Sequence, residues 1–258
     1  MSYLEISKEN GVVWIKINRP EAANALSKDV LIELTNQLEE LATDRSIRAL
    51  VITGAGDKVF SAGADLKERR GLSPEEVPQA VKRIRDTVNT VENFPAPTIA
   101  AINGSVFGGG LELALACDLR VAVNYATFAL TETTLAIIPG AGGTQRLPRT
   151  IGMPRAKEMI FTGEKIDAQT AEQWGLVNRV CESTSLLTEV EALTSKMAGN
   201  GPVALRQAKY AMDLGAQTDL NSGLTIEEKA YEVTIPTKDR TEGLEAFKEK
   251  RKPQYTGE

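Results

Sequence analysis

The alternation of short apolar segments with longer amphipathic ones over residues 12–123 is the feature that most constrains the fold of this chain. Runs rich in β-branched or small apolar residues indicate strands at residues 12–17, 48–53, 97–102 and 119–123. Apolar residues at helical spacing indicate helices between them, at residues 26–41, 74–91 and 111–117. This alternation of strands and helices predicts an α/β fold with a parallel sheet and right-handed crossovers.

After residue 154 the pattern becomes helical almost throughout. Helical spacing is present at about residues 154–162, 168–174, 184–199, 202–215, 220–234 and 240–250. A chain of 258 residues is long enough for one α/β domain with a smaller extension. We therefore expect a core domain over residues 1–195 and a helical C-terminal region over residues 196–258.

The absence of histidine narrows the chemistry that this chain can perform. Catalysis by Ser–His or Cys–His pairs is excluded. A zinc site would need the two distant cysteines, Cys117 and Cys181, together with carboxylates, so no metal is expected. Acid–base chemistry near neutral pH must then come from Glu, Asp, Lys, Tyr or Cys. An enzyme that works on thioesters or phosphates with carboxylates and backbone amides remains compatible with this composition.

Charge and cysteine content indicate the compartment and exclude some partners. The net charge of −5 argues against nucleic acid or an anionic membrane as a partner, because both require a basic surface. Cys117 lies in an apolar run and is expected to be a buried free thiol, and two cysteines form no disulfide framework. The N-terminus lacks the basic start and apolar stretch of a signal peptide, and the apolar runs are too short to span a membrane. We expect a cytoplasmic protein.

Residues 61–67 (SAGADLK) form the first of three candidate site segments. They follow a predicted strand and a turn, and they precede a short helical stretch. Small residues let a ligand approach the backbone closely, and amides at the start of a helix can donate to an oxyanion. Taken alone, the segment is more typical of a tight packing turn, because turns of small residues are common.

Residues 103–112 (NGSVFGGGLE) place three consecutive glycines between a strand and an apolar helix, where α/β proteins bind ligands. Glu112 lies one helical turn after Gly109, on the same face as the Gly109 amide. A glutamate on an otherwise apolar helix is costly unless it has a partner or a function, and burial would raise its pKa towards that of a general base. An equally weighted alternative is that Glu112 complements the helix dipole.

Glu132 belongs to the third segment, residues 131–144, in which a glycine-rich turn follows. Taken alone, Glu132 is more typical of a solvated loop glutamate. The turn (GAGGTQ, residues 140–145) lacks the lysine of a phosphate-binding P-loop. Another glycine pair, Gly54 and Gly56, suggests a dinucleotide site, but the third glycine and the helix that such a site needs do not follow, so we set it aside.

Four stretches are most informative when they are taken together: FSAGADLKE (60–68), AAINGSVFGGGLELALACD (100–118), FALTETTLAIIPGAGGTQRLPR (128–149) and AFKEKRKPQY (246–255). They resemble the crotonase (enoyl-CoA hydratase/isomerase) superfamily, and the match covers nearly the whole chain. The resemblance implies an α/β fold with a crotonase-like β-β-α spiral core and a C-terminal helical trimerisation region. It implies a homotrimer or a homohexamer (a dimer of trimers). It also implies an acyl-CoA substrate and no separate cofactor, because coenzyme A is part of the substrate.

The same resemblance assigns roles to individual residues. Glu112 and Glu132 correspond to the two glutamates that flank the reacting water. The amides of Ala64 and Gly109 correspond to the oxyanion hole for the thioester oxygen, and the amide of Gly140 helps to hold the water. The positions that match contacts to CoA or to the substrate are Lys58, Ala62, Asp65, Lys67, Arg69 and, from a neighbouring subunit, Phe247 and Lys250.

The two glutamates favour hydration over isomerisation, because isomerases of this superfamily commonly need only the one at position 132. Glu21 departs from the common short-chain enzymes, which often have a CoA-contacting lysine there. Residues 135–149 and 234–251 most resemble 3-methylglutaconyl-CoA hydratases of leucine breakdown, and a general short-chain enoyl-CoA hydratase of fatty-acid breakdown is the alternative. The resemblance places Arg69 by the acyl pocket, where a guanidinium could bind a distal carboxylate. A solvated charge is the commoner role for such an arginine.

A binding protein is the main alternative to an enzyme. The methylglutaconyl hydratases include a member that also binds AU-rich RNA through a lysine-bearing helix. The matching segment here, residues 27–46, carries four acidic residues, Glu33, Glu39, Glu40 and Asp44, against the basic Lys28 and Arg45. An acidic helix repels phosphates, which disfavours RNA binding. An inactive scaffold is disfavoured by the intact glutamate pair.

Overall fold

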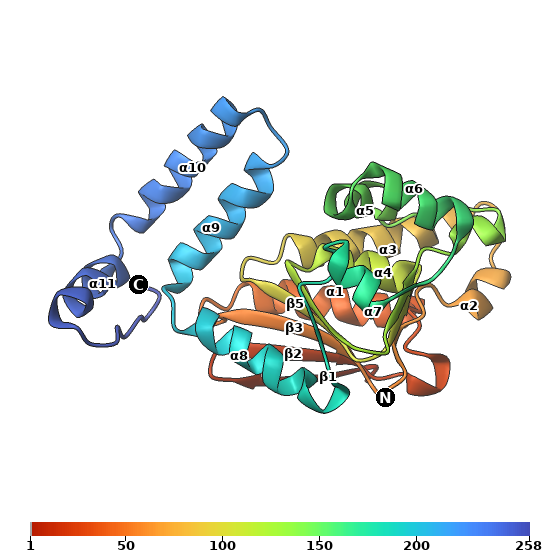
Figure 1. The fold of residues 1–258 in the computed structure, drawn as a ribbon, viewed down its shortest axis with the longest axis horizontal. Coiled ribbons are helices and arrows are strands. Elements are labelled where there is room, and N and C mark those ends of the chain that lie inside the picture. The colour runs from red at the N-terminus through yellow and green to blue at the C-terminus, as the bar shows by residue number, and fades with distance from the viewer. Residues whose placement is uncertain (1) are drawn as a thin grey trace.

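The computed structural model describes residues 2–258 and contains two β-sheets (Figure 1). The larger sheet has six strands, in the order β1 (Leu4–Glu9), β2 (Val12–Ile17), β3 (Ala49–Gly54), β5 (Thr98–Ile102), β7 (Leu119–Val123) and β10 (Arg179–Cys181). β1 pairs with β2 in the antiparallel sense, and the other neighbouring pairs are parallel. Strands β2, β3, β5 and β7 lie where the sequence predicts them, which confirms the parallel α/β prediction.

The smaller sheet has four strands, in the order β4 (Val59–Ser61), β6 (Ser105–Phe107), β8 (Thr127–Ala129) and β9 (Ile166–Asp167). Strands β4, β6 and β8 are parallel, whereas β9 runs antiparallel to β8. The sequence pattern does not predict these strands, because alternation over two or three residues is too short to distinguish a strand from a loop.

Successive strands of the chain enter the two sheets alternately. β3 leads to β4, β5 leads to β6 and β7 leads to β8, so the first strand of each pair lies in the larger sheet and the second in the smaller one. The helices that follow these pairs are α2 (Leu66–Arg70) and α3 (Val77–Glu92) after β4, α4 (Gly109–Ala116) after β6, and the 3-10 helix η2 (Glu132–Leu135) after β8. This repeat is the predicted β-β-α spiral.

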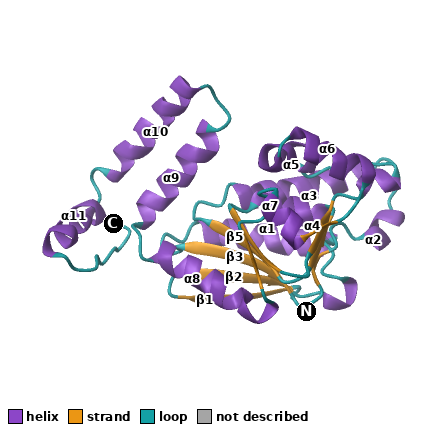
Figure 2. Cartoon of the chain, in the orientation of Figure 1, coloured by secondary structure: helices purple, strands orange, loops and turns teal. Residues whose placement is uncertain are grey.

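Helices pack around both sheets (Figure 2). α1 (Lys28–Ala42) begins at Ser27, whose Oγ accepts a hydrogen bond from the Val30 N–H, and its buried apolar side chains have helical spacing. α1 packs against α3, while α8 (Leu186–Ala198) contacts β3, β5 and β7. α4 is buried along its whole length. The remaining elements of the body are η1 (Pro20–Ala22), α5 (Gly143–Ile151), α6 (Met153–Thr162), α7 (Ala168–Gln173) and η3 (Ser183–Ser185).

Cys117 follows α4 and is buried as a free thiol, as predicted. Burial raises the pKa of this thiol to about 12, so the residue is an apolar core side chain at neutral pH.

The C-terminal helices form an arm that stands away from the body (Figure 1). α9 (Pro202–Gly215) and α10 (Leu220–Thr234) form a hairpin, and α11 (Lys238–Glu249) follows it. Lys209 Nζ on α9 lies 2.7 Å from Asp118 Oδ2 and ties the arm to the body. The hairpin exposes large apolar side chains, among them Met212 and Leu220. Across residues 2–258, each helix is too short or too polar to span a lipid bilayer. The division at residues 195 and 196 into two domains remains a prediction.

Candidate active site

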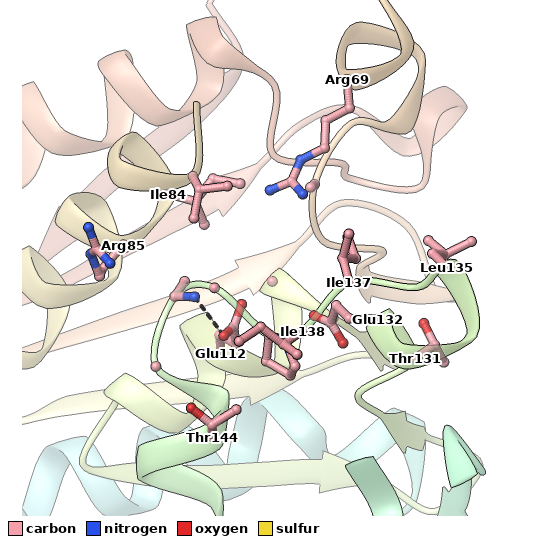
Figure 3. Close-up of a pocket in the computed structure, with 18 of the residues that line it drawn as sticks. Arg69, Ile84, Arg85, Glu112, Thr131, Glu132, Leu135, Ile137, Ile138 and Thr144 are labelled. Carbon is pink, nitrogen blue, oxygen red and sulfur yellow. Dashed lines mark hydrogen bonds between the residues drawn. The ribbon is translucent and has the colours of Figure 1, made fainter. Parts of the chain in front are cut away.

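The smaller sheet brings the three predicted site segments together. Because β4, β6 and β8 are adjacent and parallel, their carboxyl ends meet at one edge of the sheet. The chain leaves these ends through residues 62–65, 108–112 and 130–132, and these segments surround a cavity of about 740 Å³ (Figure 3). α2, α3 and residues 137–145 complete its wall. Three segments that are distant in sequence therefore line one cavity.

Glycine allows two of these segments to touch through their backbones. Gly63 has a φ of +82°, and a Cβ added there would lie 2.6 Å from the Gly109 nitrogen. A Cβ added at Gly109 would lie 3.5 Å from the Ala64 nitrogen. Within residues 2–258, neither the Ala64 N–H nor the Gly109 N–H donates a hydrogen bond, and both residues line the cavity. Two neighbouring amides are thus free to donate to an oxygen of a ligand.

Glu112 lies in the first turn of α4 and is only 2% exposed. Its Oε1 accepts hydrogen bonds from the backbone N–H of Ala141 at 2.7 Å and of Gly143 at 2.8 Å. Figure 3 draws one of these hydrogen bonds as a dashed line to Glu112. Burial raises the pKa of Glu112, although the two N–H donors and the positive charges of Arg146 and Arg69 act in the opposite direction. The predicted rise in pKa is confirmed, and the carboxylate has specific partners beyond the helix dipole.

Glu132 is the first residue of η2 and is half-buried, so it is not the solvated loop glutamate that its segment alone suggests. Its Oε2 is buried and has no hydrogen-bond partner among residues 2–258. Burial, with a smaller contribution from the negative charge of Glu112, raises the pKa of Glu132 to about 7. A carboxyl group with such a pKa can exchange protons near neutral pH without histidine.

Arg69 is the basic residue that sequence analysis predicts beside the acyl group. It is half-buried on α2, and its guanidinium points into the cavity above Glu132 and Ile137 (Figure 3). Its positive charge lowers the pKa of both glutamates, although burial outweighs it. Among residues 2–258 Arg69 has no carboxylate partner within ion-pair distance. Arg69 is therefore available to an anionic group of a ligand.

Of the other predicted residues, Ala62 and Gly140 line the cavity, whereas Lys58 and Lys67 are exposed outside it. The Asp65 carboxylate has structural partners: it caps α2 by accepting hydrogen bonds from backbone N–H groups, and it lies 3.2 Å from Arg19 Nη1. Because these partners occupy the carboxylate, the Asp65 side chain is poorly placed to bind a ligand.

Phe247 and Lys250 lie at the C-terminal end of α11, on the arm and away from the cavity of the same chain (Figure 1). Phe247 is 86% exposed. Contacts of these two residues with CoA bound to a neighbouring subunit remain a prediction.

The structure adds residues that sequence analysis missed. Arg85 lines the cavity from α3, on the same face as Val77, Val81 and Ile84. Helical spacing could have placed these four residues on one face, but nothing in the pattern distinguishes that face from an ordinary packing surface. Arg146 on α5 contacts the loop that holds Glu112, and only the fold brings the two together.

The spiral fold, the paired amides and the two glutamates define a protein of the crotonase class. The model of the enoyl-CoA hydratase/isomerase family matches residues 7–258, and the chain belongs to this family. Among its relatives is the Bacillus subtilis protein YngF, named as an enoyl-CoA hydratase/isomerase, which is 52% identical over 99% of this chain and 98% of its own length. Human mitochondrial methylglutaconyl-CoA hydratase is 48% identical over 98% of this chain and 76% of its own length.

Solved structures agree with this assignment. An enoyl-CoA hydratase from Bacillus anthracis superimposes with a TM-score of 0.98 at 52% identity, over 100% of both chains. Pseudomonas aeruginosa DspI superimposes with a TM-score of 0.95 at 38% identity, over 99% of this chain and 97% of its own. The crotonase fold therefore extends over the whole chain, including the C-terminal arm.

Proposed function

We propose that this protein is an enoyl-CoA hydratase, a hydro-lyase that adds water with syn geometry across the α,β double bond of a 2-enoyl-CoA thioester. The observation that carries this proposal is a pair of glutamates in unlike environments on one cavity, beside two amides that have no partner within residues 2–258. Hydration requires such a pair, because one group takes a proton from water and another gives a proton to Cα.

In this mechanism Glu112 is the base. The two N–H groups that donate to its Oε1 favour the ionised carboxylate. Glu112 removes a proton from water, and the water oxygen forms a bond to Cβ. The electron pair of the double bond moves towards the thioester oxygen, where the Ala64 and Gly109 amides stabilise the negative charge. Gly140, on the cavity wall, helps to hold the water.

Glu132 is the acid in this mechanism. Because its pKa is raised to about 7, a large fraction of Glu132 is protonated at neutral pH. It transfers its proton to Cα as the enolate collapses, and the product is a 3-hydroxyacyl-CoA. Glu132 loses one proton and Glu112 gains one, so the pair carries one proton both before and after the reaction. No separate cofactor enters this scheme, because coenzyme A is part of the substrate.

Absorbance of the conjugated thioester tests the proposal against isomerisation, the alternative within the family. A hydratase removes the absorbance of 2-enoyl-CoA substrates and yields a 3-hydroxyacyl-CoA. An isomerase instead creates the absorbance from 3-enoyl-CoA substrates. A panel of both substrate types, with the products identified by mass, separates the two. Turnover of 3-enoyl-CoA with no hydration of any 2-enoyl-CoA would refute the proposal.

The finer proposal is that the acyl group carries a distal carboxylate, as in 3-methylglutaconyl-CoA of leucine breakdown. Arg69 supports it, because an arginine that enters the cavity without an ion-pair partner among residues 2–258 can bind a carboxylate through two parallel hydrogen bonds. The similarity to human methylglutaconyl-CoA hydratase also supports it. A straight short-chain enoyl-CoA is the alternative substrate.

The assembly and location are part of the same proposal. We propose a homotrimer or homohexamer in which the arm of one copy brings Phe247 and Lys250 to the CoA of its neighbour, while Lys58 and Lys67 contact CoA within one chain. The apolar side chains exposed on the arm support this assembly. The two free cysteines suit a reducing compartment, and we propose the cytoplasm.

A further inference from the structure

We propose that Arg146 is a positioning residue for Glu112. It fixes the loop at residues 140–143, and this loop holds the Glu112 carboxylate in one orientation toward the substrate. The inference rests on the proposed function, in which Glu112 is the base. Arg146 does not itself line the cavity, and among residues 2–258 its hydrogen bonds go to residues other than Glu112. It acts through a chain of hydrogen bonds that joins α3, α5, the loop and α4.

The first link fixes the arginine itself. Arg146 lies on α5 with its side chain 14% exposed. Its Nε and Nη2 donate to the two oxygens of Glu92, at 2.9 and 2.5 Å, and Nη2 also donates to Asn89 Oδ1 at 2.8 Å. Both partners belong to the last turn of α3. A bidentate pair of this kind fixes the plane of the guanidinium as well as its position.

The second link fixes the loop. The remaining terminal nitrogen of Arg146, Nη1, donates to the Ala141 carbonyl at 2.8 Å. Gly142 has a φ of +106°, and a Cβ added there would lie 2.0 Å from Arg146 Nη1. The loop therefore wraps closely around the guanidinium, and glycine is required at the point of closest approach.

The third link reaches Glu112. Ala141, whose carbonyl accepts a hydrogen bond from Arg146, also donates its N–H to Glu112 Oε1 at 2.7 Å. The Gly143 N–H donates to the same oxygen at 2.8 Å. Oε1 is thus held by two donors, and Oε2 has no partner among residues 2–258. If Arg146 is lost, the Ala141 carbonyl loses its donor and the loop is free to move. Both N–H donors then leave their fixed positions, and the carboxylate can rotate.

The consequence for catalysis is measurable because the same two donors stabilise the ionised form of Glu112. The charged groups that face Glu112 are Glu132 from η2, Arg69 from α2 and Arg146 from α5. Losing the donors raises the pKa of Glu112 further, so the acidic limb of the kcat/KM profile moves to higher pH. A residue that only joined α5 to α3 would change the melting temperature and leave this limb in place.

The experiment compares Arg146→Met, Arg146→Lys and Glu92→Gln in the full-length protein, with crotonyl-CoA as substrate. Arg146→Lys keeps the positive charge but cannot form the two parallel hydrogen bonds to Glu92. This variant therefore separates the effect of the charge from the effect of the geometry. Arg149→Met is the matched control, because Arg149 is also on α5 and its side chain, among residues 2–258, donates only to Gln145 of the same helix. Circular dichroism and gel filtration show whether each variant keeps its fold and assembly.

We expect Arg146→Met to lower kcat by roughly tenfold or more with KM changed by less than about threefold, because the lost contact acts on the reacting base. The acidic limb of the kcat/KM profile should shift to higher pH by about half a unit or more in Arg146→Met, and by less in Arg146→Lys. Glu92→Gln should move it in the same direction, and Arg149→Met should not move it. If Arg146→Met does not fold, the pH profiles of Arg146→Lys and Glu92→Gln test the inference in its place.

Two outcomes separate failure of this inference from failure of the proposed function. If Glu112→Gln is inactive but the Arg146 and Glu92 variants keep the wild-type limb and lose only thermal stability, Arg146 is structural and the inference is wrong. If Glu112→Gln turns over normally, the assignment of Glu112 as base is wrong, whatever the Arg146 variants do.

Discussion

Burial and the neighbouring carboxylate of Glu112 raise the pKa of Glu132 to about 7, whereas Glu112 itself is held by two backbone N–H donors. Two identical side chains on one cavity therefore differ in their readiness to hold a proton. The negative charge of Glu112 favours the proton on Glu132. In the proposed mechanism, a chain without histidine obtains an acid and a base near neutral pH in this way.

The first prediction concerns this pair. Glu112→Gln and Glu132→Gln should each lower kcat by about a hundredfold or more, because each removes one of the two proton transfers. Binding of a saturated acyl-CoA, measured by calorimetry, should stay close to that of the wild type, since glutamine keeps the shape of the side chain. Near-normal turnover in either variant would show that the acid–base pair lies elsewhere.

Glu132 should also make the folded protein less stable at alkaline pH. Its pKa rises from 4.5 to about 7 on folding, so the folded state binds this proton more tightly than the unfolded state. The cost of ionising it is absent below about pH 4.5, grows as the pH rises and is complete above about pH 7. Because the side chain is half-buried, a discounted cost is on the order of 1–2 kcal/mol.

Glu132→Gln removes this cost and should be more stable than the wild type at pH 8, with a melting temperature higher by roughly 2–6 °C. The difference should shrink from pH 8 to pH 5, because Glu132 of the wild type becomes protonated and is then neutral, as glutamine is at every pH. Glu164→Gln, at an exposed position, controls for the amide substitution itself. A difference between Glu132→Gln and the wild type that is the same at both pH values would contradict the prediction.

Much of this site could be predicted from the sequence, for identifiable reasons. Three glycines before an apolar helix that contains a glutamate form a local pattern, which makes Glu112 a candidate with a helix-dipole role as an equal alternative. The resemblance then assigns Glu112 and Gly109 to the site. The burial of Glu132 is not a local property. It depends on β4, β6 and β8 lying side by side, and these strands are too short for their alternation to be recognised.

The partners of Glu112 could not be predicted for a similar reason. The amides of Ala141 and Gly143 reach Glu112, and the guanidinium of Arg146 reaches the Ala141 carbonyl, only because α5 packs against α4. Sequence spacing gives the residues of one face of one helix, but contacts between elements depend on the tertiary fold. The α5 helix itself is missed, since Pro148 interrupts its pattern.

The Ala64 amide provides a test of the oxyanion hole that spares the side chains. Ala64→Pro removes an N–H that donates no hydrogen bond within residues 2–258, so the fold loses no internal contact through it. Turnover should fall by about a hundredfold or more, as it does when one oxyanion donor is removed, while circular dichroism remains unchanged. Ala64→Gly keeps the N–H and should retain activity. A folded Ala64→Pro variant with normal turnover would place the donor elsewhere.

Arg69 allows the acyl specificity to be tested by one substitution and two substrates. Arg69→Met keeps an unbranched apolar stem but removes the guanidinium. If Arg69 binds a distal carboxylate, KM for 3-methylglutaconyl-CoA should rise about tenfold or more, which corresponds to roughly 1.4 kcal/mol. Crotonyl-CoA has no such carboxylate, so its hydration should be unchanged or faster.

Arg70→Met is the matched control, because Arg70 is the next residue of α2, is exposed and does not line the cavity. It should change neither KM. The positive charge of Arg69 also lowers the pKa of both glutamates, so both substrates must be compared at the optimum pH of each variant. An equal effect of Arg69→Met on the two substrates would mean that the guanidinium acts on the glutamates or on the fold of α2 and does not recognise a carboxylate. The short-chain enoyl-CoA assignment would then be preferred.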